Sequence, residues 1–197
     1  MVVASIVNCG IGNLFSLKAA LQREGITTEI VSEIDEKETD VVVLPGVGSF
    51  GEACRKLPKA AIGEWVEAGK PLLGICLGLQ LFFEKSEEGE GEGLAILPGT
   101  VRRLPNSVKV PHIGWNRIDI KSGEGLLQGL DDAPWAYFVH SYYPQTKGPW
   151  VTAMTEYGVE FCSAAEWKNV WGLQFHPEKS GRAGRAILRN FASMVRK

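Results

Sequence analysis

Short apolar runs and helical patterns alternate along the first part of the chain. Four runs predict buried strands, at Val2–Val7, Thr27–Ser32, Val41–Leu44 and Pro71–Ile75. Between the first two, leucines recur at helical spacing from Leu14 until Gly25 ends the helix, and Ala60–Ala68 predicts another helix. Strands that alternate with helices predict a parallel sheet with helices on both faces.

The pattern becomes richer in β structure toward the C-terminus. Glu87–Gly93 is acidic and glycine-rich, which is typical of an exposed loop. After it, four runs predict strands of more antiparallel character, at Val108–Ile120, Trp135–Tyr143, Val151–Thr155 and Val170–Phe175. A last helix is expected from about Ala183. We therefore predict a single α/β domain over residues 1–197, with a mostly parallel central sheet flanked by helices and an antiparallel, β-rich portion in its C-terminal half.

Composition and charge narrow the class of protein. Hydrophobic residues make up 45% and charged residues 22%, as in a soluble globular domain. The net charge of −2 argues against a protein whose main task is to hold nucleic acid. No apolar run is long enough to span a membrane, and the N-terminus lacks the pattern of a signal peptide. We expect a cytoplasmic protein.

The four cysteines are widely spaced and include no CxxC pair, so we expect no structural zinc site, disulfide framework, metal or cofactor. Cys76 stands apart, because it lies between Gly74 and Gly78 where an apolar strand meets a helical pattern. A reactive side chain on such a turn is typical of a nucleophile elbow, and the following helix would direct its positive end at the sulfur. The alternative is a buried cysteine at a glycine-flanked strand end.

A thiol nucleophile needs a base, and the base needs an acceptor that orients it. Among the three histidines, His176 is followed by Pro177 and Glu178. In an extended chain, residues two apart project to the same side, so Glu178 can reach the imidazole of His176. Pro177 biases His176 toward an extended conformation. Cys76, His176 and Glu178 are thus a candidate triad.

A glycine-rich segment offers donors for an oxyanion. Pro45–Gly48 follows the third predicted strand, next to the strand that leads to Cys76. Its unshielded N–H groups predict an anion-binding nest beside Cys76. A phosphate-binding loop is the rival interpretation, but the lysine and hydroxyl of a Walker loop are absent. A second cluster, Gly10–Gly12, lacks the third glycine of a dinucleotide-binding turn, so we reject that function.

In their order and spacing, the elbow, the glycine nest and the His-Pro-Glu segment resemble the class I (triad) glutamine amidotransferases. These enzymes hydrolyse glutamine and pass ammonia to a synthase partner. The resemblance spans nearly the whole chain and implies a flavodoxin-like domain. It implies that Cys76 is the nucleophile, His176 the general base and acid, and Glu178 the orienting carboxylate. Gly48 and Leu77 would supply the oxyanion-hole N–H groups.

Further segments are similar to the glutaminase subunits of imidazole glycerol phosphate synthases, enzymes of histidine biosynthesis. They are Asn8–Asn13, Pro45–Gly51, His112–Asn116, Phe138–Tyr143 and His176–Ser180. This resemblance implies a heterodimer with a (β/α)₈-barrel cyclase, which uses the ammonia to make imidazole glycerol phosphate and aminoimidazole carboxamide ribotide. Paralogues that serve nucleotide-sugar amidation remain an alternative, because one subunit does not display the acceptor.

Residues that bind L-glutamine are expected close to Cys76. Gln80 lies one helical turn after Cys76, so it faces the same side and can bind the amino-acid end of the substrate. Glu88, in the acidic loop, can accept the substrate ammonium. The resemblance adds three residues to the substrate site: Gly46, Ser141 and Tyr142.

A surface for the synthase is predicted from residues that the triad does not need. Trp115 lies between a glycine and an asparagine, which suits an interface anchor better than a core strand. We assign five residues to this face: Asn13, His112, Trp115, Tyr137 and Lys179.

Three other classes of protein compete with this interpretation. A cysteine protease or deglycase of the same broad fold shares the elbow, but it does not need the Pro45–Gly48 nest or His-Pro-Glu at this distance. Glutaminase subunits of pyridoxal phosphate or purine synthesis share the triad but should lack the segment His112–Asn116. A non-catalytic module would tolerate the loss of a triad residue, and none is lost.

Overall fold

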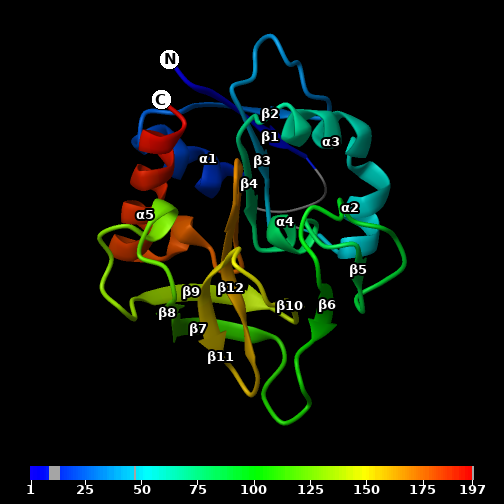
Figure 1. The fold of residues 1–197 in the computed structure, drawn as a ribbon, viewed down its shortest axis with the longest axis vertical. Coiled ribbons are helices and arrows are strands. Elements are labelled where there is room, and N and C mark those ends of the chain that lie inside the picture. Colours follow the sequence, from blue (N-terminus) through cyan, green and yellow to red (C-terminus); the bar gives the residue numbers. More distant parts are fainter. Residues whose placement is uncertain (9–13, 47, 197) are drawn as a thin grey trace.

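The computed structural model describes residues 1–8, 14–46 and 48–196, and in this part of the chain the largest sheet has eight strands (Figure 1). Five of its strands are parallel: β1 (Val3–Val7), β2 (Thr27–Val31), β3 (Val41–Leu44), β4 (Leu72–Ile75) and β13 (Val170–Leu173). They lie in the order β2-β1-β3-β4-β13, which is the flavodoxin-like order of a doubly wound sheet. The predicted parallel sheet is therefore confirmed.

Antiparallel strands extend this sheet beyond β13. They are β12 (Glu160–Trp167), β11 (Val151–Glu156) and β8 (Asp119–Ile120). A second sheet has the order β10 (Tyr142–Gln145), β6 (Thr100–Arg103) and β5 (Lys85–Ser86). A third pairs β7 (His112–Arg117) with β9 (Trp135–His140). The prediction of an antiparallel, β-rich portion in the C-terminal half is confirmed.

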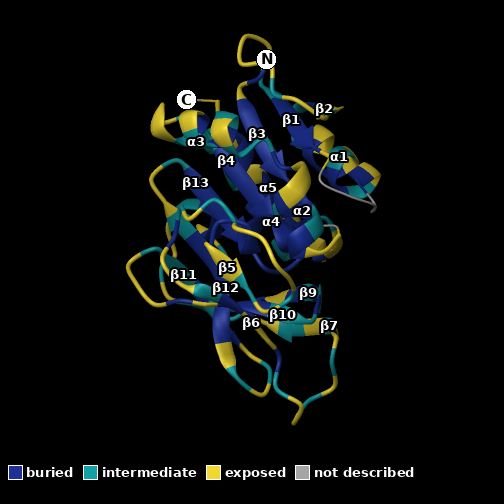
Figure 2. Cartoon of the chain, turned by 90° about the vertical axis from the view of Figure 1, so that its right-hand side faces the viewer, coloured by how far each residue is buried: buried dark blue, intermediate teal, exposed yellow. Residues whose placement is uncertain are grey.

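Helices cover both faces of the parallel strands (Figure 1). One face carries α1 (Leu14–Arg23) and α5 (Gly181–Met194), and the other carries α2 (Phe50–Lys56), α3 (Lys59–Glu67) and α4 (Leu77–Gln80). Successive side chains of a strand alternate between these two cores: Val41 and Val43 pack with α1 and α5, whereas Val42 and Leu44 pack with α2 and α3. Both layers are therefore apolar, and Figure 2 shows β3 and β4 between them as buried.

Two long predicted strands are divided in the structure. The run Trp135–Tyr143 breaks at Ser141, whose carbonyl accepts a hydrogen bond from Leu104 N, so that β9 pairs with β7 and β10 pairs with β6. The run Val108–Ile120 begins only at β7 and breaks at Ile118, where the chain leaves β9 and β8 joins the largest sheet. Hydropathy did not reveal these breaks because it does not report a change of partner strand.

The prediction missed the strands β5, β6 and β12 and the helix α2. β12 contains Ser163, Ala164 and Ala165, small residues with weak strand propensity, although all three are buried in the sheet. α2 begins beside the glycine-rich nest and includes Gly51, so its sequence favours a loop. Its N-terminus is stabilised from a distance, because Glu88 Oε2 accepts a hydrogen bond from Phe50 N at 2.7 Å.

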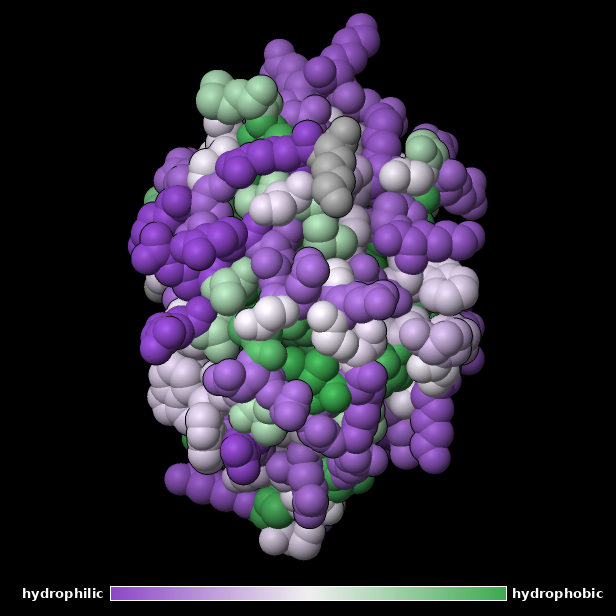
Figure 3. Space-filling view, turned by 60° about the vertical axis from the view of Figure 1, so that its left-hand side comes forward, coloured by the Kyte–Doolittle hydropathy of each residue, from purple (hydrophilic) through white to green (hydrophobic). Residues whose placement is uncertain are grey.

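Hydrophilic side chains predominate on the face shown in Figure 3. Arg185 and Arg189 of α5 hold Glu24, which follows α1, with Nε–oxygen distances of 3.1 and 3.4 Å. These pairs join the two helices on one side of the sheet. Within the described ranges, no helix is long and apolar enough to cross a membrane.

Candidate active site

The predicted catalytic segments meet at the carboxyl ends of three adjacent parallel strands. Gly46 follows β3, Cys76 follows β4, and His176 follows β13 after two intervening residues. Ligands of open α/β sheets bind outside the carboxyl ends of the strands, and these three residues lie on the β4 side of the β1/β3 position where the strand order reverses. The topology therefore brings together residues that are far apart in the sequence.

Cys76 occupies a strained turn between β4 and α4. Its backbone angles are φ 53° and ψ −103°, a conformation that only a strongly constrained non-glycine residue adopts. Gly78 allows the close approach of this turn to β3, because a Cβ there would overlap the carbonyl group of Leu44. The helix expected behind the sulfur is present but is only one turn long, Leu77–Gln80, so its contribution to the local field is small.

His176 and Glu178 form a buried pair. His176 Nδ1 lies 2.8 Å from Glu178 Oε1, and both side chains are almost fully enclosed. The reason given from the sequence needs correction: His176 is extended, but Pro177–Lys179 is a turn of 3-10 helix (η2) rather than extended chain. The carboxylate reaches the ring because the chain turns back on itself, not because the two side chains alternate along a strand.

Electrostatics favour the charged form of this histidine. Burial alone would lower the pKa of His176, but its interactions with Cys76 and Glu178 outweigh burial and raise the pKa to about 10. Its Nε2 is buried and makes no hydrogen bond within the part of the chain that the structure describes. His176 thus lies close enough to the Cys76 sulfur to interact with its charge, while its Nε2 remains available to a reacting group.

Two further residues position the histidine, and sequence reasoning assigned neither to this task. Ser180 Oγ donates to His176 O at 2.6 Å and accepts from Tyr137 N at 2.9 Å. Tyr137 O in turn accepts from His176 N at 2.9 Å. Ser180 was predicted only within a family segment, and Tyr137 only as an interface residue. Their roles depend on backbone contacts between β9 and η2 that leave no local pattern.

Gln174 was also missed, although it touches the sulfur. Its Nε2 lies 3.4 Å from Cys76 Sγ, and the residue is fully buried. A second contact joins Cys76 Sγ to Val139 O at 3.8 Å. One signal in the sequence could have identified Gln174. It is a single polar residue between Leu173 and Phe175 in an apolar run, and a buried polar side chain needs a hydrogen-bond partner.

A cavity of about 220 Å³ opens beside Cys76. Every residue predicted for the oxyanion hole and for glutamine lines it: Gly46, Gly48, Leu77, Gln80, Glu88, Ser141 and Tyr142. Gly48 has φ +98°, which a glycine adopts readily, while Val47 lies outside the described residues. The structure thus gathers the expected binding residues around one thiol.

Gln80 and Glu88 are already engaged with the protein. Gln80 Nε2 donates to Tyr142 O at 2.8 Å and to Gln174 Oε1 at 3.1 Å, so both of its amide hydrogens are used. One oxygen of Glu88 holds Phe50 N. Burial raises the pKa of Glu88, and the hydrogen bond from Phe50 N opposes that shift. These two side chains can therefore accept hydrogen bonds from a ligand through their oxygen atoms, but they have no free N–H group to donate.

Three of the residues assigned to a partner surface cluster together. The rings of Trp115 and Tyr137 are 6.0 Å apart, and Lys179 Nζ lies 5.8 Å from the centre of the Tyr137 ring. Trp115 is 52% exposed. His112 differs from these three, because it lies between the rings of Phe138 and Tyr157 and is 3% exposed, so its assignment to the partner surface stays a prediction. Asn13 lies outside the described residues.

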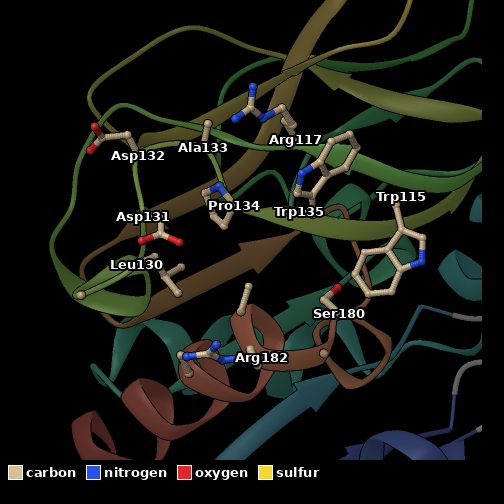
Figure 4. A pocket seen from close by; sticks show the side chains of 14 residues that line it. Trp115, Arg117, Leu130, Asp131, Asp132, Ala133, Pro134, Trp135, Ser180 and Arg182 are labelled. Carbon is tan, nitrogen blue, oxygen red and sulfur yellow. The ribbon is translucent and has the colours of Figure 1, made fainter.

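A larger cavity of about 830 Å³ adjoins this cluster but contains none of the three triad residues. Figure 4 shows Trp115 and Trp135 on one side of it and Asp131 and Asp132 on the other. The cavity belongs to the outer surface around Trp115, not to the thiol site.

The other described cysteines are poor nucleophiles. Cys54 and Cys162 are unpaired and buried. Desolvation raises the pKa of Cys54, and it raises the pKa of Cys162 to about 12. Among the described residues, no group of three or more histidine, cysteine or acidic side chains is arranged to hold a metal.

Residues 5–195 match the model of the glutamine amidotransferase class-I family. The chain belongs to the class I glutamine amidotransferases. This amidotransferase is 46% identical over 200 residues to imidazole glycerol phosphate synthase subunit HisH of Moorella thermoacetica, covering 98% of this chain and 95% of the relative. It is 48% identical over 192 residues to the subunit of the same name from Pyrococcus furiosus, covering 95% and 96% of the two chains.

Solved structures agree with the fold of this amidotransferase. PurLQS from Thermotoga maritima superposes with a TM-score of 0.78 at 18% identity, covering 98% of this chain and 97% of that one. A putative GMP synthase protein from Thermoplasma acidophilum gives a TM-score of 0.76 at 22% identity, covering 100% and 94%.

Proposed function

We propose that this amidotransferase is the glutaminase subunit of an imidazole glycerol phosphate synthase, with residues 1–197 as one domain. The observation that carries the proposal is the meeting of Cys76 with the His176–Glu178 pair, in a chain about 45% identical to subunits of that name. The subunit hydrolyses L-glutamine, and a cyclase uses the ammonia in histidine biosynthesis. A cytoplasmic location follows from this biosynthetic role.

Cys76 is the proposed nucleophile. Its sulfur attacks the side-chain amide carbon of glutamine, and the N–H groups of Gly48 and Leu77 stabilise the oxyanion that forms. His176 Nε2–H gives its proton to the amide nitrogen. The carbon–nitrogen bond then breaks, which releases ammonia and leaves a γ-glutamyl thioester on Cys76.

His176 acts as the base in the second half of the reaction. Once the sulfur is acylated it no longer carries negative charge, so the interaction that favours the imidazolium is lost. The neutral ring takes a proton from water, and the hydroxide attacks the thioester. The carbon–sulfur bond breaks to give glutamate, while the thiolate–imidazolium pair returns. Glu178 holds the ring at Nδ1 in both steps.

The amino-acid end of glutamine is proposed to bind at Gln80 and Glu88. Both line the cavity beside Cys76, and both present oxygen atoms that can accept hydrogen bonds from an ammonium group. Gly46, Ser141 and Tyr142 complete the lining. A glutamine analogue without the α-amino group should therefore bind more weakly.

Labelling by a glutamine-mimicking electrophile tests the assignment of the nucleophile. Peptide mapping is expected to find the label on Cys76, with Cys54 and Cys162 as internal controls because burial raises their pKa values. Cys76→Ser should abolish the use of glutamine, while free ammonia still supports synthesis by the assembled enzyme. A label on another cysteine would contradict the mechanism.

The partner is proposed to be a (β/α)₈-barrel cyclase that binds the face around Trp115, Tyr137 and Lys179. An exposed tryptophan beside a tyrosine and a cation is typical of interface anchors. Trp115→Ala should weaken association with the cyclase at least tenfold in a titration. Trp167→Ala, at another exposed tryptophan, is the matched control and should leave association unchanged.

Activity is proposed to depend on the partner, because ammonia released without an acceptor is wasted. We expect slow glutamine turnover by the chain alone and strong stimulation by the cyclase with its nucleotide ligand, mainly in kcat. Equal turnover in all conditions would contradict this control. Supplying a nucleotide-sugar acceptor with its own synthase separates the histidine-pathway role from the alternative amidation role.

A further inference from the structure

A row of buried polar side chains links the outer face of β7 to the Cys76 sulfur. Its members after Asn116 are almost fully enclosed: His112 is 3%, His140 6%, Gln80 4% and Gln174 0% exposed. A buried polar side chain is costly unless it is hydrogen-bonded, so the bonds made by such a row have a strong influence on its geometry. We call it the buried polar row.

One carbonyl determines the orientation of every member. Tyr142 O can only accept hydrogen bonds, and two side chains point at it: His140 Nδ1 at 2.9 Å and Gln80 Nε2 at 2.8 Å. His140 must therefore carry its proton on Nδ1, and the Gln80 amide must have its nitrogen toward the carbonyl.

The outer half of the row follows from the His140 tautomer. With the proton on Nδ1, His140 Nε2 is an acceptor, so His112 Nδ1 donates to it across 3.1 Å. His112 Nε2 is then the acceptor for Asn116 Nδ2 at 3.5 Å. Burial keeps both rings neutral, since it lowers the pKa of His112 to about 4 and that of His140 to about 3.

The inner half follows from the Gln80 amide. Its second hydrogen goes to Gln174 Oε1 at 3.1 Å, which leaves Gln174 Nε2 directed at Cys76 Sγ, 3.4 Å away. An N–H group directed at sulfur stabilises negative charge on it and limits its position. A flip of Gln80 would place oxygen against oxygen at both of its contacts, and a flip of Gln174 would place its nitrogen against Gln80 Nε2. The row therefore has one consistent arrangement.

We propose that the buried polar row positions the Cys76 sulfur and transmits changes at the β7 face to it. The row cannot carry a proton along its length, because Tyr142 O has none to pass on. His112, His140 and Gln174 are thus positioning residues. The regulatory part of this inference rests on the proposed function, in which a synthase binds beside Trp115, the neighbour of Asn116.

Alkylation of Cys76 by iodoacetamide in the isolated chain tests the row without glutamine or a partner. His112→Phe keeps a flat ring between Phe138 and Tyr157 but has no N–H donor, and the rate should fall about five- to tenfold. His112→Asn can restore the donor and should stay within about threefold of the unmodified chain. Ile113→Ala, at an exposed position on the same strand, is the control and should not alter the rate.

A double-mutant cycle distinguishes an effect of His112 that reaches the sulfur through Gln174 from a general loosening of the site. Gln174→Leu removes the donor to the sulfur and should itself lower the alkylation rate. If the row acts through Gln174, adding His112→Phe to Gln174→Leu should cause less than a twofold further loss. Additive losses, or no loss with His112→Phe alone, would overturn the inference.

A second variant, at the half-exposed residue Asn116, tests the row if His112→Phe does not fold. Asn116→Asp keeps the acceptor for Arg117 N but places an oxygen opposite both His112 Nε2 and Glu156 O. The melting temperature is measured beside the alkylation rate, which should again fall in the folded variant; an unchanged rate contradicts the row. In the assembled enzyme, kcat should fall while KM stays within about twofold. Failure of Cys76→Ser to affect glutamine use would reject the proposed function but not the alkylation result.

Discussion

Gly46 lies so close to the nucleophile that a single added carbon atom would disturb it. A Cβ at this position would be 2.6 Å from Cys76 Cβ and 2.7 Å from Ile75 O. We predict that Gly46→Ala lowers glutamine turnover at least 100-fold, because a misplaced nucleophile loses its alignment. Turnover and thermal unfolding should both be measured.

Gly63→Ala is the matched control for this prediction. Gly63 lies within α3, and a Cβ there would meet no atom within 4 Å. The change should leave turnover intact and stabilise the helix by roughly 0.5–1 kcal/mol. Equal losses for the two variants would show that the close approach at Gly46 is not the cause.

Glu178 affects the reaction through His176. Glu178→Gln keeps an oxygen acceptor for Nδ1–H, but it removes the negative charge that helps raise the pKa of His176. We predict a fall in kcat of about 10- to 1,000-fold with KM little changed, and a larger loss for His176→Ala. Full activity of Glu178→Gln would exclude the carboxylate from the mechanism.

At the level of elements, Ser180 fastens η2 to β9. Its hydroxyl bonds both His176 O and Tyr137 N, and the residue is 1% exposed. Ser180→Ala should cost about 1–3 kcal/mol of stability, because Tyr137 N loses the Ser180 acceptor and His176 O keeps only the bond from Lys179 N, and it should lower kcat. Ser193→Ala tests the same change at an exposed position of α5 and should alter neither.

The elements differ in how well the sequence predicts them. The elbow at Cys76 and the His176–Glu178 pair could be predicted because each is encoded within a few residues. Ser180 and Gln174 could not, since their partners belong to strands distant in sequence. The same limit hid β12, a strand of small residues that is stabilised by neighbours on both sides.

For the whole molecule, the buried histidines predict sensitivity to acid. Unfolded, His112 and His140 take up protons near pH 6.5; folded, they do so only near pH 4 and 3. The unfolded state therefore binds more protons as the pH falls from about 6.5 toward 4, and the free energy of unfolding decreases. Each histidine contributes a slope of up to about 1.4 kcal/mol per pH unit.

Urea unfolding at pH 7, 5.5 and 4.5 measures this loss. His112→Phe should lose less stability than the unmodified chain over the same range, because one of the two titrating rings is absent. Carboxyl groups titrate in both proteins, so the difference between them isolates the histidine. Parallel pH profiles would show that protonation of His112 does not destabilise the fold.

The insertion of β13 between β4 and β12 has a consequence for synthesis on the ribosome. β4 and Cys76 are synthesised before β13 and His176, and His176 follows Cys76 by 100 residues. Until then the nascent chain holds a thiol without its base, beside an unpaired edge of β4. Products truncated before His176 would thus lack the complete triad. The order of translation therefore prevents an incomplete chain from hydrolysing glutamine.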